Sequence, residues 1–241
     1  MSKLLIVTSG WSYNHWKEIF YPKDLASEKW LSFYAETFPT VEINNSFYHL
    51  PSRETFETWR AQTPPDFVFA VKASRFITHL KKLKEVEEPL NRLLTNALGL
   101  GAKLGPFLFQ FPPNWNKNAE RLKSFLAILP PNRKFVFEFR NETWFDREIF
   151  QLLRAKNAAL CITSSPDFPS SKEITTPFTF IRMHGGKELY GSNYSERELR
   201  IWAKLVSRLL EEGIAVYVYF NNDAYGYAVK NAVRLREILG M

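Results

Sequence analysis

Short apolar segments alternate with longer amphipathic stretches along the whole chain, and this alternation constrains the fold more than any other feature. Strands that alternate with helices predict a parallel sheet with crossover helices. Eight such units in 241 residues predict closure into a (β/α)8 barrel, an α/β fold of about 250 residues. We therefore expect one domain over residues 1–241, with an open doubly wound sheet as the alternative. The predicted strands are Leu4–Thr8, Thr40–Asn44, Phe67–Lys72, Phe107–Phe111, Lys134–Phe139, Ala159–Thr163, Phe178–His184 and Ile214–Asn221.

The amphipathic stretches between these strands predict seven helices. Ser195 and Glu198 have the spacing of a capping box, and Gly213 and Gly240 follow the last helical residues, where a glycine commonly ends a helix. The link between the sixth and seventh strands, residues 164–177, contains three prolines and predicts an irregular connection instead of a helix. The predicted helices are Glu28–Thr37, Arg53–Gln62, Leu80–Leu98, Ala119–Leu129, Arg147–Lys156, Ser195–Glu212 and Ala224–Leu239.

The charge balance favours an anionic partner. Lys and Arg number 32 against 25 Asp and Glu, a formal charge of +7, which suits phosphates, carboxylates or nucleic acid; a basic surface that serves only solubility is the alternative. The single cysteine, Cys161, excludes a disulfide framework and fits a reducing compartment. The sequence has no secretory apolar region and no apolar run near the ~20 residues of a membrane span. We expect a cytoplasmic protein with no membrane association.

Polar side chains gather at the C-terminal ends of the predicted strands, which form the functional face of a closed parallel barrel. Strand side chains alternate between two faces, so the phenylalanines and aliphatic residues would pack under the helices while the polar residues point into the barrel mouth. The eighth strand and the loop after the first add residues whose orientation the alternation leaves open. The predicted mouth holds Glu42, Asn44, Lys72, Gln110, Glu138, Arg140, Arg182 and His184, with Asn221, Asn222, Asp223, Trp11 and Tyr13 around it.

Two interpretations of this charged cluster are open. The cluster binds a ligand, or its charges pair with one another, Glu138 with Arg140 or Arg182 and Glu42 with Lys72, and only close the top of the barrel. Buried charges are costly unless they are paired. Because five strands end independently in charged or amide side chains, we favour a ligand site.

Short motifs in a fixed order cover essentially the whole chain. They are Thr8-Ser9-Gly10-Trp11-Ser12-Tyr13 with Trp16 and Phe20-Tyr21-Pro22, Thr40-Val41-Glu42-Ile43-Asn44 with Ser46-Phe47-Tyr48 and Leu50-Pro51, Phe69-Ala70-Val71-Lys72, Ile77-Thr78-His79, Leu104-Gly105-Pro106, Gln110-Phe111-Pro112-Pro113, Glu138-Phe139-Arg140 with Trp144, Arg182-Met183-His184-Gly185, and Tyr219-Phe220-Asn221-Asn222-Asp223. In these motifs the chain resembles the YecE-like family, also called domain of unknown function 72. The resemblance implies a (β/α)8 barrel with the motifs around its mouth, and it implies no reaction.

One segment departs from the family pattern. Similar sequences often carry an aspartate after the sixth strand, where this chain has Thr163-Ser164-Ser165-Pro166. If that aspartate takes part in chemistry, this chain lacks it or substitutes water for it.

The mouth residues favour an enzyme, a hydrolase, lyase or isomerase, that acts on a small phosphate- or carboxylate-bearing substrate by general acid–base chemistry. Lys72, Arg140 and Arg182 would bind the anion, and Lys72 would also serve in catalysis. Glu138 or Glu42 would be the general base, and His184 would donate or accept protons near neutral pH. An Arg182→Ala variant is expected to fold normally and to lose phosphate-bearing ligands. Further substrate contacts are expected from Asn44, Gln110, Asn221, Asn222, Asp223, Trp11 and Tyr13.

Other functions are weighed against this one. The positive charge and the loop aromatics Trp11, Tyr13, Tyr48, Trp115, Trp144 and Tyr190 would suit nucleic-acid binding, with or without phosphodiester cleavage. Glu42, Glu138, His184 and Asp223 are metal-ligand types, but three neighbouring cations would repel a dication, so no metal and no cofactor is expected. A glycosidase would need acids at the ends of the fourth and seventh strands, which hold Gln110, Arg182 and His184. A monomer and a homodimer both stay open.

Overall fold

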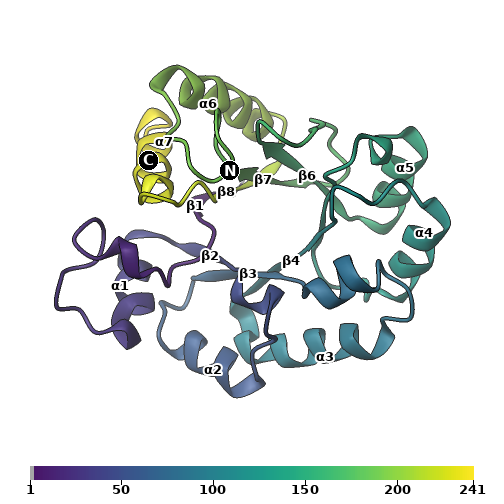
Figure 1. The fold of residues 1–241 in the computed structure, drawn as a ribbon, viewed down its shortest axis with the longest axis horizontal. Coiled ribbons are helices and arrows are strands. Elements are labelled where there is room, and N and C mark those ends of the chain that lie inside the picture. Colours follow the sequence, from purple (N-terminus) through teal and green to yellow (C-terminus); the bar gives the residue numbers. More distant parts are fainter. Residues whose placement is uncertain (1–2) are drawn as a thin grey trace.

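The computed structural model describes residues 3–241 and confirms the (β/α)8 barrel. Within these residues eight parallel strands form one sheet in the order β1-β8-β7-β6-β5-β4-β3-β2, and seven helices surround it (Figure 1). The strands are β1 (Leu4–Thr8), β2 (Thr40–Ile43), β3 (Val68–Lys72), β4 (Leu104–Gln110), β5 (Phe135–Glu138), β6 (Ala159–Ser164), β7 (Phe178–Met183) and β8 (Ala215–Phe220). The helices are α1 (Trp30–Thr37), α2 (Arg53–Ala61), α3 (Glu87–Ala97), α4 (Ala119–Ile128), α5 (Arg147–Lys156), α6 (Glu196–Glu211) and α7 (Tyr227–Ile238).

The barrel closes between β1 and β2 at one point. All the other neighbouring strands pair along a register of at least two residues, whereas β1 and β2 meet, in the described part of the chain, through one bridge between Ser9 and Glu42. There the Gly10 amide donates to the Glu42 carbonyl oxygen at 2.9 Å. The closure therefore lies at the mouth, directly after β1.

The alternation along the strands places phenylalanines under the helices and polar side chains in the interior near the mouth, as the sequence predicts. Phe109 and Phe137 stack at a centroid distance of 5.5 Å and both contact Phe125 of α4. On the opposite face, the Thr40 hydroxyl lies 3.0 Å from the Tyr219 hydroxyl. Tyr219 therefore points into the barrel, and Asn221, two residues later, shares that direction. This settles the orientation that the sequence left open for the end of β8.

Strand β4 begins three residues earlier than predicted and contains Pro106. The pairing of β3 with β4 shifts register between Phe69 and Val71, where two residues of β3 face three of β4. A bulge of this kind accommodates a proline, which cannot donate a ladder hydrogen bond. Gly105 is required beside it, because a Cβ there would lie 2.6 Å from Val68 Cγ1 and 2.9 Å from the Phe69 carbonyl oxygen.

The third helix is the largest error of the sequence prediction. It was expected over residues 80–98, but α3 begins at Glu87, after a single π-helical turn at residues 76–80 and a segment in which Lys82, Leu83 and Glu85 have positive φ. Pro89 explains the late start, because a proline ring clashes with the carbonyl four residues earlier and is tolerated only in the first turn. Helix α7 also begins late, since Gly226 caps it with φ 67°.

The remaining helix predictions hold within two residues. Helix α6 carries the predicted capping box of Ser195 and Glu198, and Gly213 and Gly240 adopt positive φ after α6 and α7. Among residues 3–241, no helix is both long and apolar enough to cross a membrane.

The link between β6 and β7 is irregular, as its prolines predict. Thr175 holds it against β6, because its hydroxyl donates to the Ala158 carbonyl at 2.7 Å and accepts from the Leu160 amide at 3.0 Å. The Ser170 hydroxyl accepts from the Thr163 amide at 3.0 Å. These side chains take the place of the missing crossover helix on this side of the barrel.

Candidate functional site

Arg182 of β7 lies at the centre of a buried charged cluster at the barrel mouth. Its side chain is fully buried, and Nε and Nη2 donate to the two carboxylate oxygens of Glu42 at 2.9 and 2.6 Å. Nη1 donates to Glu138 Oε2 at 2.7 Å, and Nη2 also reaches Ser9 Oγ at 3.3 Å. All three guanidinium nitrogens therefore donate hydrogen bonds to Glu42 of β2, Glu138 of β5 or Ser9, which follows β1. The direct contact between Arg182 and a substrate that the sequence suggests is not available in this arrangement.

Glu138 of β5 joins Arg182 to a second arginine. Its Oε1 accepts from Arg140 Nε at 2.7 Å. Burial alone would raise the pKa of Glu138, but the guanidinium groups of Arg182 and Arg140 hold that pKa well below its usual value. Arg140 also donates to the Tyr190 hydroxyl at 3.2 Å and lies over the Phe168 ring at 4.2 Å. Unlike Arg182, Arg140 borders an open space.

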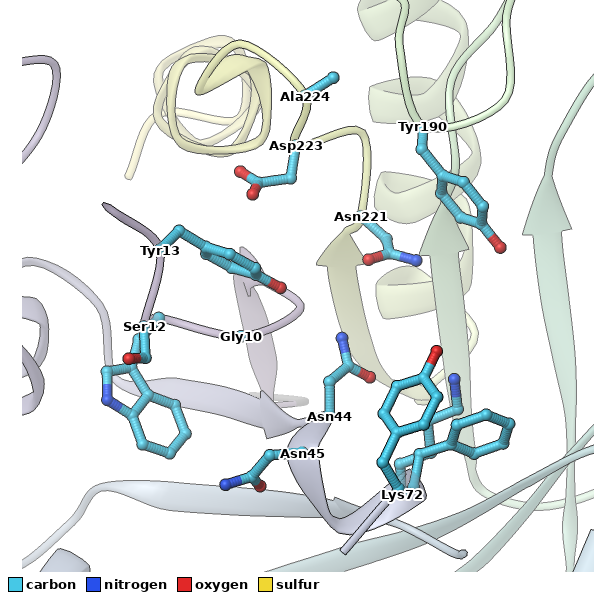
Figure 2. A pocket seen from close by; sticks show the side chains of 13 residues that line it. Gly10, Ser12, Tyr13, Asn44, Asn45, Lys72, Tyr190, Asn221, Asp223 and Ala224 are labelled. Carbon is cyan, nitrogen blue, oxygen red and sulfur yellow. The ribbon is translucent and has the colours of Figure 1, made fainter. Parts of the chain in front are cut away.

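Two adjoining cavities occupy the mouth. The mouth cavity, of about 530 Å³, is bordered by the loop after β1 and the ends of β2, β3 and β8 (Figure 2). The side cavity, of about 310 Å³, is lined by Phe47, Tyr48, Lys72, Arg75, His79, Gln110, Arg140 and Tyr190. Phe47, Tyr48, Lys72 and Tyr190 line both. These volumes suit a small metabolite.

Lys72, the last residue of β3, lies between the two cavities. The sequence suggested an ion pair with Glu42, but Glu42 is taken by Arg182 and no ion pair of Lys72 is formed within residues 3–241. Its Nζ lies 4.2 Å from the centroid of the Phe47 ring. Burial, followed by the positive charge of Arg182, lowers the pKa of Lys72 to about 7.

His184 faces Glu138 from the end of β7. Its Nδ1 lies 3.1 Å from Asn221 Nδ2, which donates to it, so the ring proton sits on Nε2, 3.6 Å from Glu138 Oε1. Nε2 is buried without a hydrogen bond. Burial lowers the pKa of His184 to about 4, although the neighbouring Glu138 carboxylate acts to raise it. The imidazole is therefore neutral at pH 7.

Six of the seven predicted amide and rim residues line the two cavities, and Asn222 lines neither. Trp11, Tyr13, Asn44, Asn221 and Asp223 line the mouth cavity, and Gln110 lines the side cavity. Asn222 does not belong there: its amide donates to the Ser192 carbonyl at 2.9 Å and to Asn231 Oδ1 at 2.8 Å, which fixes the loop before α6 to α7. The side chains of the neighbouring Asn221 and Asp223 point away from that of Asn222 and line the mouth cavity.

Asp223 and Asn44 are held by hydrogen bonds within the mouth. Asp223 Oδ1 accepts from Trp16 Nε1 at 2.6 Å, Oδ2 lies 3.0 Å from His15 Nε2, and burial raises the pKa of Asp223 to about 6. Asn44 Nδ2 donates to Ser9 Oγ at 2.7 Å, while its Oδ1 is buried without a partner. An unpartnered buried carbonyl oxygen is a site for a ligand donor.

Two of the loop aromatics proposed for base stacking are unavailable. Trp115 and Trp144 are buried and pack against Phe111, with centroid distances of 4.5 and 5.1 Å. Tyr48, by contrast, is 66% exposed at the rim of both cavities. For metals, no three His, Cys, Asp or Glu side chains in the described part of the chain lie close enough together to hold an ion.

The chain matches the family described as Protein of unknown function DUF72 over residues 5–241. This protein belongs to the DUF72 family. It is 30% identical to UPF0759 protein YunF of Bacillus subtilis over 274 aligned residues, which cover 98% of this chain and 94% of YunF. It is 31% identical to UPF0759 protein YecE of Escherichia coli over 113 residues, 46% of this chain and 42% of YecE. The crystal structure of a DUF72 family protein from Thermotoga maritima is similar with a TM-score of 0.89 and 29% identity, covering 99% of this chain and all of that one.

Sequence reasoning missed part of the side cavity of this DUF72 protein. Arg75 was not predicted, because the segment after β3 was not expected to turn back over the mouth. His79, which in the sequence fits a capping or packing residue as well as a catalytic one, lines the cavity with its Nε2 3.5 Å from Gln110 Nε2. The position of both residues just after the end of β3 was the available signal.

The segment in which this chain departs from the family pattern is held by loop contacts. Ser164, the last residue of β6, has its hydroxyl 2.9 Å from that of Tyr194. Neither Ser164 nor Ser165 lines the two cavities.

Acid should destabilise this DUF72 protein between about pH 6.5 and pH 4 through His184. The unfolded chain binds the imidazole proton below its ordinary pKa of 6.5, whereas the folded chain binds it only near 4. The free energy of unfolding therefore falls as the pH drops through this window, by about 3 kcal/mol for His184. Urea unfolding at pH 7, 5.5 and 4 measures it, and between pH 7 and pH 4 the free energy of unfolding of a His184→Gln variant should fall by about 3 kcal/mol less than that of the wild type. His49→Gln, on an exposed side chain, is the control; equal pH profiles for wild type and His184→Gln would contradict the assignment.

Proposed function

We propose that this DUF72 protein is an enzyme that binds a small phosphate- or carboxylate-bearing substrate at the barrel mouth. One observation carries the proposal: the side cavity is lined by Lys72, Arg75 and Arg140, and by no acidic side chain among the described residues. Arginine guanidinium groups bind carboxylates and phosphates through two parallel hydrogen bonds. Arg75 forms no ion pair within residues 3–241, and an anion in the side cavity would offset its positive charge.

The charged cluster beneath the cavities supports this proposal by positioning Arg140. Glu138 fixes the Arg140 Nε, and the Phe168 ring supports the guanidinium face, so the remaining nitrogens are held toward Tyr190 and the side cavity. Glu42, Glu138 and Arg182 therefore act as a rigid base for the binding groups. This differs from the sequence hypothesis, in which Glu138 or Glu42 was the general base and Arg182 touched the substrate.

Proton transfer falls to groups that border the cavities. His79 is half-buried, and burial followed by the charge of Lys72 lowers its pKa to about 4, so its neutral ring can accept a proton. The Tyr190 hydroxyl can donate one, since it accepts its own hydrogen bond from Arg140. Asn44 and Asn221 would orient a carbonyl or hydroxyl group of the substrate in the mouth cavity.

Anion binding is tested by calorimetry with inorganic phosphate and with oxalate at low and high salt. An Arg75→Met variant, whose side chain is exposed and makes no ion pair in the described structure, should fold normally and bind these anions about tenfold more weakly, since a hydrogen bond to a charged group contributes about 1.5–3 kcal/mol. Arg208→Met, in the last turn of α6 at the opposite end of the barrel, is the matched control and should bind as the wild type does.

Failure of the wild type to bind either anion at low salt would refute the proposal. Short single-stranded oligonucleotides distinguish the competing function: tight binding that weakens steeply with salt, with no binding of the small anions, would favour a nucleic-acid ligand.

A further inference from the structure

The Lys72 side chain is largely buried, and its amino group, which borders the cavities, has no hydrogen-bonding or ionic partner in residues 3–241. The side chain is 9% exposed, and Nζ makes a cation–π contact with the Phe47 ring, 4.2 Å from its centroid. Lys103 provides a comparison, because it is also 9% exposed but donates to the carbonyl oxygens of Arg60 and Thr63 at 2.6 Å and to the Thr63 hydroxyl at 3.1 Å. A buried lysine in this fold can thus be fully satisfied, and Lys72 is not.

The surroundings of Lys72 favour its neutral form. The two carboxylates that would stabilise an ammonium group, Glu42 and Glu138, are already bound to Arg182, and Arg182 and Arg140 add positive charge. Burial is the largest cause and brings the pKa to about 7. A large fraction of the side chains therefore carries a free electron pair on Nζ at neutral pH, as an amine nucleophile requires.

The amino group is also accessible to a ligand. It lies where the mouth cavity and the side cavity meet, and Figure 2 shows it pointing from the strand end toward the space between Asn44 and Tyr190. Arg75 and Arg140 border the side cavity on one side of it, and the amides of Asn44 and Asn221 border the mouth cavity on the other. A ligand whose anionic group lies against the arginines would place a neighbouring carbon next to Nζ.

We propose that Lys72 forms an imine with a carbonyl compound that carries a carboxylate or a phosphate group. This inference rests on the proposed anion site and names its substrate class, a 2-oxo acid or a phosphorylated aldehyde or ketone. Neutral Nζ adds to the carbonyl carbon, and one proton passes from Nζ to the carbonyl oxygen to give a neutral carbinolamine. The hydroxyl takes a second proton from the Tyr190 hydroxyl and leaves as water, while the electron pair of Nζ forms the C=N bond of a protonated imine; nothing is oxidised or reduced.

Tyr190 is placed to serve this step. It lines both cavities with Lys72, and its hydroxyl accepts from Arg140 Nη2, which leaves its own proton free to be donated to the carbinolamine hydroxyl. Its backbone has φ 62°, a conformation that side-chain-bearing residues rarely adopt. The loop is held in this form by the bond from the Tyr190 amide to the His184 carbonyl at 2.6 Å. Strain of this kind concentrates at functional residues.

Reductive trapping tests the inference on the full chain. The protein is incubated at pH 7.5 with pyruvate, glyoxylate or dihydroxyacetone phosphate, treated with sodium borohydride, and analysed by intact mass and peptide mapping. We expect one reduced adduct per chain, located on Lys72 and at least tenfold above the labelling of Lys103. The Lys72→Arg variant keeps a positive charge and should give no adduct, and Lys72→Met provides a second variant if arginine does not fit the site.

The outcomes separate this inference from the proposed function. Wild-type protein that binds inorganic phosphate or oxalate but gives no adduct on Lys72 with any of the three carbonyl compounds overturns the imine and leaves the anion site standing. Protein that binds neither anion overturns the proposed function itself. An adduct that persists in both Lys72 variants, or that is spread over exposed lysines, also overturns the assignment of Lys72.

Discussion

Replacement of Arg182 by methionine is expected to lower the free energy of unfolding by about 3–5 kcal/mol, the usual effect of removing one partner of a buried ion pair. The guanidinium is fully buried and binds Glu42 and Glu138, so its loss leaves two buried carboxylates without their shared partner. This revises the expectation from sequence that an Arg182 variant folds normally. Urea unfolding at pH 7 measures the change.

Two comparisons sharpen the Arg182 prediction. Arg200→Met removes an exposed pair with Glu196 on α6 and should leave the unfolding midpoint nearly unchanged. A triple variant, Arg182→Met with Glu42→Gln and Glu138→Gln, should be more stable than Arg182→Met alone, because it removes the uncompensated charges as well. If Arg182→Met unfolds at the wild-type urea concentration, the cluster does not support the barrel mouth.

Replacement of Lys72 by methionine is expected to have the opposite effect and to raise the free energy of unfolding by about 4 kcal/mol at pH 7. The unfolded chain binds the amino proton below the ordinary pKa of 10.5, whereas the folded chain binds it only below about 7. Stability of the wild type therefore rises with pH across this window, and the advantage of Lys72→Met should shrink toward pH 10. A methionine of similar length fills the same space under Phe47.

Lys103→Met is the matched control for this second prediction. Its amino group satisfies the carbonyl oxygens of Arg60 and Thr63, so its loss should destabilise the protein by about 1–3 kcal/mol. The two buried lysines thus give changes of opposite sign in the same assay. A Lys72→Met variant that is less stable than the wild type would show that the ammonium group has a stabilising partner.

The sequence predicts the barrel because the relevant patterns are local. Each strand of this chain is marked by its own short apolar segment, and Ser195, Gly213 and Gly240 mark helix ends from immediate neighbours. The incorrect prediction of helix over residues 80–86 has a local cause too, since Pro89 is tolerated only in the first turn and so limits how early the third helix can begin. The bulge at Gly105 and Pro106 depends on pairing with β3, a contact between strands that no single segment reveals.

The sequence predicts most of the residues at the barrel mouth, but it does not predict which of these side chains pair with one another. The alternation of side chains brings Glu42, Glu138 and Arg182 to the same interior face, but which cation the carboxylates bind depends on how far each side chain reaches across the barrel. Arg182 reaches both, and Lys72 is left without a partner. The direction of Asn222 depends on the turn after β8, where its amide meets Asn231 of α7.

The closure of the barrel at Ser9 and Glu42 has a mechanical consequence. The same serine hydroxyl that lies at this seam donates to Glu42 Oε1 at 2.5 Å, and the same carboxylate holds Arg182. The lateral contact with the fewest strand-pairing bonds is therefore built from residues at the floor of the mouth cavity. Transient opening of the cylinder would begin beneath a bound ligand, and a ligand that contacts both sides of this seam would hold β1 and β2 together.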